Sequence, residues 1–389
     1  MKVLQVIPTL SGLSGGPAQG LKYLGLGLKS QGVEVAILTA DAPSKKQEYS
    51  FGGVRVYSFA SYFRHFLPAQ FNYSPGLSKW LKKHIKEFDL LHIHYLFTYP
   101  STVAAYYARK CAIPYILRPA GMLGPACLKK SALRKKIYMR LFENLNLKSA
   151  AAIHFTSEKE RIEAACLRLN NRNIVVPNCI DLQDFKGLSA LRGEFRKQYP
   201  QIGQRKIILF LSRLDPIKGL DLLIPALKIL KEQHEDFYFV LAGAGRNDYQ
   251  EQLKIDIGVA GLTDSVLFAG FLEGEAKYAL LADADIFVLS SYHENFGIAA
   301  AEAMASGLPV AISDQVSIYG LVEEYQAGIA FGLNSLQIAQ SLEKLLRDKE
   351  LCLKMGKNGR RLIEENFSAE KIARQMLEKY QNVRNNRDI

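Results

Sequence analysis

The stretch IFVLSSYHENFGIAAAEAMASGLPVAIS, residues 286–313, contains two short apolar runs with an alanine-rich segment between them. The runs Ile286–Ser290 and Val310–Ser313 have the length and the aliphatic content of buried strands. Alanine has the highest helix propensity, so Ile298–Ser306 is predicted to be a helix. A strand, a helix and a second strand in close succession predict a βαβ unit with two parallel strands.

Short apolar runs alternate with amphipathic segments along the rest of the chain, which predicts more βα units of the same kind. The runs form two series, and the polar segment 182–205 separates them. The other expected strands are Val3–Ile7, Val33–Thr39, Leu90–His94, Ile113–Leu117, Ala151–Thr156, Ile174–Val176, Ile207–Ser212, Phe237–Ala242 and Val266–Ala269, with helices such as Leu220–Gln233 and Tyr278–Leu281.

We therefore predict an α/β protein of two Rossmann-like, doubly wound parallel-sheet domains. The first comprises residues 1–184 and 370–389, because the last helical pattern, after Phe367, can cross back to it. The second comprises residues 185–369. A chain of 389 residues fits two domains of ordinary size. Ligands bind at the carboxyl ends of the strands in such sheets, so the two domains are expected to face a central cleft.

The charge of the chain is unevenly distributed. Residues 1–184 carry 25 Lys and Arg against 11 Asp and Glu, whereas residues 185–389 carry 25 against 27. This asymmetry indicates an anionic partner for the first half. Residues 128–148 read as a basic amphipathic helix, which either lies on an anionic membrane surface or packs on the sheet with a solvated face. Its basic residues are Lys129, Lys130, Arg134, Lys135, Lys136, Arg140 and Lys148.

No run reaches the roughly 18 apolar residues of a membrane-spanning helix, and the N-terminal apolar run is too short for a signal peptide. We expect a cytoplasmic protein that can associate peripherally with the inner face of the cell membrane. The cysteines are odd in number and include no C-x-x-C pair, which argues against a disulfide framework and a zinc site. We expect them to be reduced and mostly buried. They are Cys111, Cys127, Cys166, Cys179 and Cys352.

Two glutamates bracket the predicted start of the helix in the opening stretch. Phe296 and Gly297 precede that helix, where free backbone N–H groups and the helix dipole favour a phosphate. Glu294 lies just before them, and Glu302 lies about one turn inside the helix. A carboxylate there can accept hydrogen bonds from two neighbouring hydroxyls. The alternative is one capping glutamate and one solvated glutamate.

Two cations follow the first predicted strand of the second domain. Arg213 and Lys218 flank a proline-containing loop at the carboxyl end of that strand. The planar guanidinium and the ammonium can together neutralise a diphosphate. Taken alone, the pair also fits a basic surface loop.

Glycine pairs and a histidine lie at other predicted strand ends. Gly15 and Gly16 follow the first strand and let the backbone approach a ligand closely. Gly243 opens a Gly-Ala-Gly loop that lacks the third glycine of a dinucleotide fingerprint, which argues for a nucleotide pocket and against a nicotinamide enzyme. His94 ends the strand Leu90–His94 at the ligand-binding edge. It is either a substrate contact or a structural residue.

Asp283-Ala284-Asp285 has the form of a D-x-D metal motif but stands before a strand rather than after one. We interpret these residues as exposed carboxylates that end a helix. His92 and His94 lie on one face of their strand, and no further ligands complete a zinc site. The sequence therefore predicts no metal centre.

Taken together, these residues resemble glycosyltransferase family 4, and the resemblance covers essentially the whole chain. The matching stretches occur in the family's order and spacing. They are SGGPA at 14–18, DLLHIH at 89–94, VVPNCID at 175–181, LSRLDPIKGLD at 211–221, FVLAGAG at 239–245 and ENFGIAAAEAMASGLPV at 294–310.

The resemblance implies a GT-B fold and a retaining glycosyltransferase that uses a nucleotide-diphosphate sugar and no metal or other cofactor. In the second domain it implies that Arg213 and Lys218 clamp the diphosphate and that the backbone at Phe296 and Gly297 supports it. Gly243 would line the nucleotide pocket. Glu302 would bind the ribose hydroxyls, and Glu294 would contact hydroxyls of the donor sugar.

In the first domain, the resemblance implies that His94 reaches the donor sugar and that Gly15 and Gly16 line the phosphate and acceptor side. Two departures from the family pattern stand out. Cys179 occupies a position that is usually glycine, and Arg118 stands where many relatives carry a histidine. We expect Arg118 to take an acceptor or phosphate role.

The predicted enzyme is a hexosyltransferase that moves sugar from a UDP- or GDP-sugar to a lipid-linked or cell-surface glycan. One alternative is a nucleotide-sugar 2-epimerase on the same fold, and another is a non-catalytic nucleotide-sugar-binding homologue. A nucleic-acid partner is not expected, because the basic residues form no recognised nucleic-acid-binding module.

Overall fold

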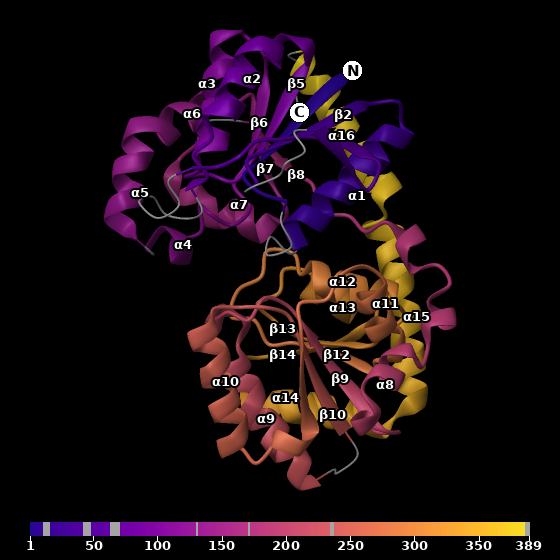
Figure 1. Ribbon diagram of the computed structural model, residues 1–389. Coiled ribbons are helices and arrows are strands. Elements are labelled where there is room, and N and C mark those ends of the chain that lie inside the picture. The colour runs from indigo at the N-terminus through magenta and orange to yellow at the C-terminus, as the bar shows by residue number, and fades with distance from the viewer. Residues whose placement is uncertain are drawn as a thin grey trace. The chain divides into compact units, whose positions relative to one another are not determined.

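The computed structural model describes residues 1–10, 16–41, 48–62, 71–129, 131–169, 172–233 and 237–385. The chain divides into two compact units (Figure 1). One comprises Met1–Cys179 and Ala369–Ile389, and the other comprises Ile180–Ser368. These boundaries follow residues 179 and 368, whereas the sequence placed them after residues 184 and 369.

The first unit is built on an eight-stranded sheet in the order β3-β4-β2-β1-β5-β6-β7-β8. Only β3 and β4 pair in antiparallel fashion; the other neighbours are parallel. The strand order reverses at β1, which pairs with β2 on one side and β5 on the other. The strands are β1 (Lys2–Ile7), β2 (Glu34–Thr39), β3 (Glu48–Phe51), β4 (Val54–Ser58), β5 (Leu90–His94), β6 (Tyr115–Arg118), β7 (Ala152–Phe155) and β8 (Arg172–Val175).

The C-terminal helix α16 belongs to this first unit and packs against α1. Gly27 permits the contact, because a Cβ at this position would lie 2.6 Å from the carbonyl oxygen of Ala369. The helices are α1 (Gly16–Ser30), α2 (Pro75–His84), α3 (Tyr99–Lys110), α4 (Pro125–Lys129), α5 (Ala132–Tyr138), α6 (Asn144–Ser149), α7 (Glu158–Ala164) and α16 (Ala369–Arg384), with a π-helical segment η4 (Met139–Glu143) between α5 and α6.

The second unit is built on a six-stranded, wholly parallel sheet in the order β11-β10-β9-β12-β13-β14. The strand order reverses at β9, which lies between β10 and β12. The strands are β9 (Lys206–Leu211), β10 (Phe237–Ala242), β11 (Val266–Gly270), β12 (Ile286–Leu289), β13 (Val310–Ser313) and β14 (Gly328–Phe331). The helices are α8 (Glu194–Gln198), α9 (Leu220–Gln233), α10 (Asn247–Val259), α11 (Gly274–Asp283), α12 (Ile298–Ala305), α13 (Tyr319–Glu324), α14 (Ser335–Arg347) and α15 (Lys349–Asn366).

The central strands β1, β9, β10 and β12 are almost entirely buried, as expected for parallel strands covered on both faces. Their near-continuous apolar runs explain why the sequence located them. Three short strands, β3, β4 and β14, were not predicted. β3 and β14 are sheet edges of four residues each, and their mixed burial gives no clear apolar run.

Three other expectations were wrong. The basic segment 128–148 is not one helix, because Ser131 adopts a left-handed conformation before α5 and the π-helical η4 follows α5. Asp283 and Asp285 are not free surface carboxylates. Asp283 is buried and accepts a hydrogen bond from the backbone of Arg196, while Asp285 accepts one from Ile207 N and pairs with the guanidinium of Arg196.

The cysteines are free thiols, but they are not mostly buried. Cys179 is buried and Cys166 is exposed, while the other three have intermediate exposure. None of the helices within the described ranges is long and apolar enough to span a bilayer.

Candidate active site

In the second unit, the predicted donor residues gather at the carboxyl edge of the sheet. The loop after β9 hydrogen-bonds to the loop after β10 on one side, where Leu214 N contacts the Ala244 carbonyl at 2.9 Å. On the other side it contacts the loop after β12, where Tyr292 N donates to the Ile217 carbonyl at 2.8 Å. This is the point of strand reversal, where open parallel sheets bind ligands.

Local sequence signals shape the loop after β9. Asp215 accepts a hydrogen bond from Ile217 N, Pro216 begins the short turn Pro216–Lys218, and Gly219 ends it with φ of 69°. Glycine is required at the end of this turn, because a Cβ there would lie 2.0 Å from the Ser290 carbonyl. The Ser290 hydroxyl donates to the carbonyls of Lys218 and Gly219, which fixes the turn against β12.

Gly243, which the sequence predicts to line a nucleotide pocket, lies at the same edge of the sheet. Its φ is 149°, and a Cβ there would lie 1.8 Å from the Ser212 carbonyl. The loops after β9 and β10 can therefore run side by side only with glycine at this position.

The structure brings Lys218 and Glu294 together. Lys218 is only 7% exposed, and its ammonium forms an ion pair with the Glu294 carboxylate. The Glu294 backbone is held by Ser317, whose N–H and hydroxyl both donate to the Glu294 carbonyl at 3.0 Å. Arg213 is exposed and forms no hydrogen bond or ion pair with any residue in the described ranges. Its guanidinium is therefore available to a ligand.

Helix α12 begins beside this pair. Gly297 caps it with φ of 87°, and the buried Phe296 packs edge-on against Phe367 at 5.0 Å between ring centroids. The first-turn N–H groups of such a helix point away from its body and favour a phosphate.

Glu302 is buried on α12, where its carboxylate pairs with the Lys277 ammonium at 2.8 Å. Lys277 lies on α11 and is not among the site residues that the sequence predicts. No motif marks it, because it precedes Glu302 by 25 residues and is joined to it only by the packing of two helices. The pair neutralises a carboxylate that would otherwise be buried without a partner.

In the first unit, His94 lies in a buried cluster at the carboxyl end of β5. Its Nε2 lies 2.7 Å from Gln5 Oε1, and its ring centroid lies 4.4 Å from that of His92. Tyr380 of α16 bonds to both Gln5 and His92, at 2.9 and 2.7 Å. Gln5 and Tyr380 were not predicted. The pairing of β1 with β5 brings Gln5 to His94, and the return of α16 to this sheet brings Tyr380 to Gln5.

Arg118 is also buried, at the carboxyl end of the neighbouring strand β6. Its Nη2 donates to Asn178 Oδ1 at 2.5 Å, while its Nε has no partner among the described residues. Burial lowers the pKa of Arg118, and the nearby Glu160 carboxylate partly offsets this effect. A buried guanidinium with an unused N–H is suited to an anionic or strongly polar substrate group.

Gly16 is the first residue of α1, the helix that follows β1 in the chain. Gly15 lies outside the described residues. Within those residues, no group of three or more His, Cys, Asp or Glu side chains could hold a metal ion.

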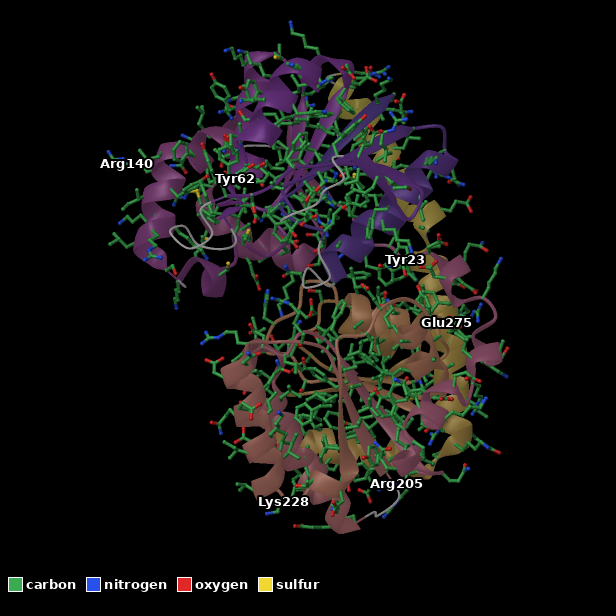
Figure 2. The ribbon with its side chains drawn as sticks, in the orientation of Figure 1. Tyr23, Tyr62, Arg140, Arg205, Lys228 and Glu275 are labelled. Carbon is green, nitrogen blue, oxygen red and sulfur yellow. The ribbon has the colours of Figure 1, made fainter. Side chains whose placement is uncertain are left out.

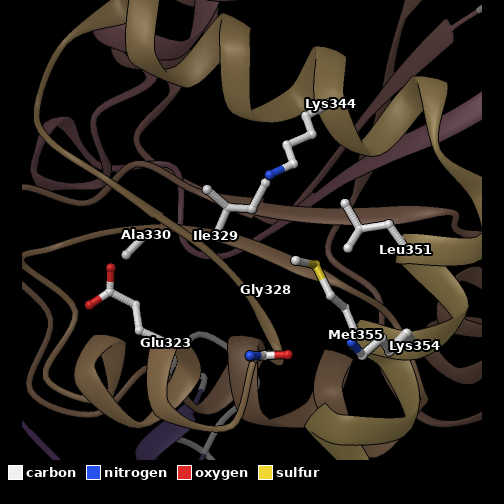
Figure 3. A pocket seen from close by; sticks show the side chains of 9 residues that line it. Glu323, Gly328, Ile329, Ala330, Lys344, Leu351, Lys354 and Met355 are labelled. Carbon is white, nitrogen blue, oxygen red and sulfur yellow. The ribbon is translucent and has the colours of Figure 1, made fainter.

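Side chains also line a hollow of about 340 Å³ beside the edge strand β14 (Figure 3). None of the predicted site residues lines it. Its lining residues are Glu323, Gln326, Gly328, Ile329, Ala330, Lys344, Leu351, Lys354 and Met355.

Two family models match the chain. The model for the glycosyl transferase 4-like domain matches residues 15–179, and the model for glycosyl transferases group 1 matches residues 192–362. The chain belongs to the group 1 glycosyltransferases. The predicted family and the predicted class of enzyme, a hexosyltransferase, are therefore confirmed.

Two sequence relatives illustrate the range of this family. An uncharacterised glycosyltransferase of Methanocaldococcus jannaschii is 28% identical over 94% of each chain. A GDP-mannose-dependent phosphatidylinositol monomannoside mannosyltransferase of Mycobacterium tuberculosis is 28% identical over 52% of this chain and 54% of its own.

Among solved structures, Anabaena HepE in complex with UDP-glucose has a TM-score of 0.78 at 21% identity, with 98% of this chain and 100% of that chain covered. At this identity the likeness shows the fold alone, and it confirms the predicted GT-B fold of this glycosyltransferase.

The buried histidines generate a prediction about acid stability. Burial lowers the pKa of His92 and His94 well below 6.5, and it lowers the pKa of His154 to about 3; the Arg118 charge acts in the same direction on all three. Their folded forms stay neutral, while the unfolded chain takes up protons below pH 6.5. The contribution of these histidines to the free energy of unfolding is therefore fully present above pH 6.5. It is lost as the pH falls towards their pKa values in the folded protein. If unfolding takes up three protons, the free energy of unfolding changes by about 4 kcal/mol per pH unit.

Trp80, the single tryptophan of the chain, lies in the first unit and reports its unfolding. Its fluorescence in denaturant titrations should show a steep loss of stability between pH 6.5 and 5. His293→Asn, which removes a histidine of the second unit, should leave the slope unchanged. A wild-type slope that corresponds to less than one proton would contradict the neutral cluster.

Proposed function

We propose that this glycosyltransferase moves a hexose from a UDP- or GDP-sugar to an acceptor hydroxyl with retention of configuration and without a metal. The observation that carries the proposal is the Lys218–Glu294 ion pair beside the N-terminus of α12, at the carboxyl edge where β9 and β12 meet. HepE binds UDP-glucose, and the mycobacterial relative uses GDP-mannose. These two relatives support a nucleotide sugar as donor.

In the proposed reaction, the bond between the sugar C1 and the diphosphate oxygen breaks, and the electron pair stays on the phosphate. The acceptor oxygen attacks C1 from the same face, and its proton passes to the leaving phosphate oxygen. Arg213, Lys218 and the first turn of α12 stabilise the negative charge that develops. Fixed cations and N–H dipoles are often the largest catalytic contribution, and here they replace a metal ion.

The carboxylates recognise the donor. Glu302, held by Lys277 through one oxygen, has its other oxygen for the ribose hydroxyls. Glu294 accepts hydrogen bonds from the sugar hydroxyls while it orients Lys218. From the first unit, His94 contacts the sugar, and Arg118, Gly15 and Gly16 serve the acceptor side.

A nucleotide-sugar 2-epimerase on the same fold is the second candidate. It would release a different sugar without an acceptor, whereas a transferase releases nucleoside diphosphate in proportion to glycosylated acceptor. A non-catalytic binding homologue would release neither product. The presence of Arg213, Lys218, Glu294 and Glu302 together favours transfer.

Removal of either cation should lower turnover. We expect Arg213→Ala and Lys218→Ala to reduce kcat by roughly 10²–10³, the range for lost electrostatic donors. Glu302→Ala should act mainly on donor binding. The measurement is the release of UDP or GDP from UDP-glucose or GDP-mannose, with and without a glycan acceptor.

Lys228→Ala is the matched control, because Lys228 is an exposed cation on α9 of the same unit (Figure 2). It should retain wild-type turnover. If both cation variants turn over at near-normal rates, the assignment of the diphosphate site is wrong.

The first unit also presents a surface suited to an anionic membrane, which fits a lipid-linked acceptor. Four aliphatic side chains on α5, η4 and α6 are exposed, at spacings of four residues: Leu133, Ile137, Leu141 and Leu145. Exposed basic residues accompany them, and Figure 2 shows Arg140 pointing away from the unit. Glu143 is the one acidic residue of the segment 125–149, and it is buried, with Phe97 N donating to its carboxylate.

The π-helical segment η4 lies within this aliphatic stripe and should narrow its spread round the helix. In an α-helix a spacing of four residues advances by about 40° per step, so a stripe of four residues would spread over about 120° of the helix surface. A π-turn uses more residues per turn and takes back part of this rotation. The basic residues beside the stripe can then meet lipid phosphates while the aliphatic residues enter the membrane.

The double variant Leu133→Asp/Leu141→Asp should bind phosphatidylglycerol vesicles roughly 10²-fold more weakly, because each buried leucine contributes about 1.5 kcal/mol or more. Cosedimentation with phosphatidylglycerol and with phosphatidylcholine vesicles measures this. Val259→Asp is the control, since Val259 is 83% exposed in the second unit and Leu133 is 72% exposed. Equal binding by all three proteins would eliminate this surface as the membrane contact.

A further inference from the structure

Five hydrogen bonds join three histidines, a glutamine and a tyrosine in the core of the first unit. His154 Nε2 lies 2.7 Å from the Val176 carbonyl, and His154 Nδ1 lies 3.1 Å from His92 Nε2. His92 Nδ1 contacts the Tyr380 hydroxyl, Gln5 Nε2 donates to that hydroxyl, and His94 Nε2 contacts Gln5 Oε1. The chain of contacts runs from the Val176 carbonyl, just beyond β8, to His94 at the end of β5.

The Val176 carbonyl sets the direction of every bond in this chain. A carbonyl can only accept, so His154 carries its proton on Nε2, and its Nδ1 accepts. His92 Nε2 must then donate to His154, which leaves His92 Nδ1 to accept from the Tyr380 hydroxyl. The Tyr380 oxygen accepts from the Gln5 amide, and Gln5 Oε1 accepts from His94 Nε2–H.

The opposite assignment of donors and acceptors is impossible at the Val176 carbonyl. If Gln5 donated to His94, each bond along the chain would invert, and a lone pair of His154 Nε2 would face the Val176 carbonyl. With three neutral rings, only one set of hydrogen-bond directions satisfies all of the observed contacts. Their lowered pKa values are consistent with neutral rings at pH 7.

We propose that Gln5 and Tyr380 are positioning residues that fix His94 in its Nε2–H tautomer and so present its Nδ1 as an obligate hydrogen-bond acceptor for a sugar hydroxyl. Nδ1 has no hydrogen-bond partner among the described residues, so its lone pair can accept a hydrogen bond from a ligand. The inference rests on the proposed function, in which His94 contacts sugar. It adds that His94 accepts from the sugar and cannot donate to it.

The C-terminal helix thereby takes part in substrate recognition from a distance. Tyr380 lies 288 residues from His92 in the sequence and makes no hydrogen bond to His94 within the described part of the chain. Arg118 on β6 is the charged neighbour of the three rings and disfavours an imidazolium at any of them. A hydroxyl donor suits such a site.

Tautomers are measured directly by long-range ¹H–¹⁵N NMR of the histidine rings in the full-length protein at pH 7. The wild type should show Nε2–H forms for His92, His94 and His154, assigned by the loss of signals in single histidine variants. In Tyr380→Phe, the Gln5 amide loses its acceptor and is free to invert, so His94 should become a mixture of tautomers. His92 and His154 should stay Nε2–H, because Val176 still anchors them.

Two further proteins sharpen the test. Gln5→Met removes the hydrogen bonds to His94 and to the Tyr380 hydroxyl but leaves Tyr380 bonded to His92, and it should release the same tautomer. Tyr325→Phe removes a tyrosine hydroxyl from the second unit, where it bonds to Glu365, and should change none of the three rings. A wild-type His94 that carries its proton on Nδ1 would overturn the proposal, and so would a pure Nε2–H form of His94 in both Tyr380→Phe and Gln5→Met.

Ligand titrations separate this inference from the proposed function. UDP-glucose or GDP-mannose should shift the His94 Nδ1 signal, whereas UDP or GDP alone should not. If the tautomers are equally populated in Tyr380→Phe, its affinity for the nucleotide sugar should fall about twofold, with no change for the bare diphosphate. Failure of every nucleotide to bind would reject the proposed function while the tautomer pattern stands. Binding of the sugar nucleotide without a shift at Nδ1 would reject the inference.

Discussion

In an open parallel sheet, helices cover both faces, so ligands bind at the edge where the strands end. Both units of this glycosyltransferase obey that constraint. In the second unit, Arg213, Gly243 and Glu294 follow β9, β10 and β12 at the carboxyl edge; in the first unit, His94 and Arg118 end the neighbouring strands β5 and β6. The side chains that the strand ends and the loops after them place at these edges therefore determine the chemistry of the molecule.

Burial of charged and polar groups at such an edge demands partners, and the two units meet this demand differently. The second unit pairs opposite charges, Lys218 with Glu294 and Lys277 with Glu302. Phosphate and hydroxyl groups of a ligand can exchange with these partners. The first unit keeps its histidines neutral in a directional chain of hydrogen bonds that ends at His94. The ion pairs of the second unit thus fit the proposed diphosphate site, and the neutral histidines of the first unit fit the proposed sugar contact.

The sequence predicted those parts whose signals are local. Long apolar runs located β1, β9 and β10, and the Asp-Pro and Gly signals marked the loop around Lys218. Short edge strands such as β14 gave no such signal, and one apolar pattern did not reveal the break at Ser131 or the π-helical turn. The sequence did not predict Lys277 and Tyr380, because their partners are distant along the chain. Only the packed fold brings them to Glu302 and His92.

Thermal unfolding with UDP, GDP, ADP and dTDP, in the wild type and in Glu302→Ala, tests most directly whether the second unit holds a nucleoside diphosphate. A ligand present at about 100 times its dissociation constant adds roughly 2.7 kcal/mol of stability, which raises the melting temperature measurably. UDP or GDP should stabilise the wild type, and this effect should be largely lost in Glu302→Ala. Stabilisation by none of the four, or the same stabilisation in both proteins, would contradict the proposed diphosphate site.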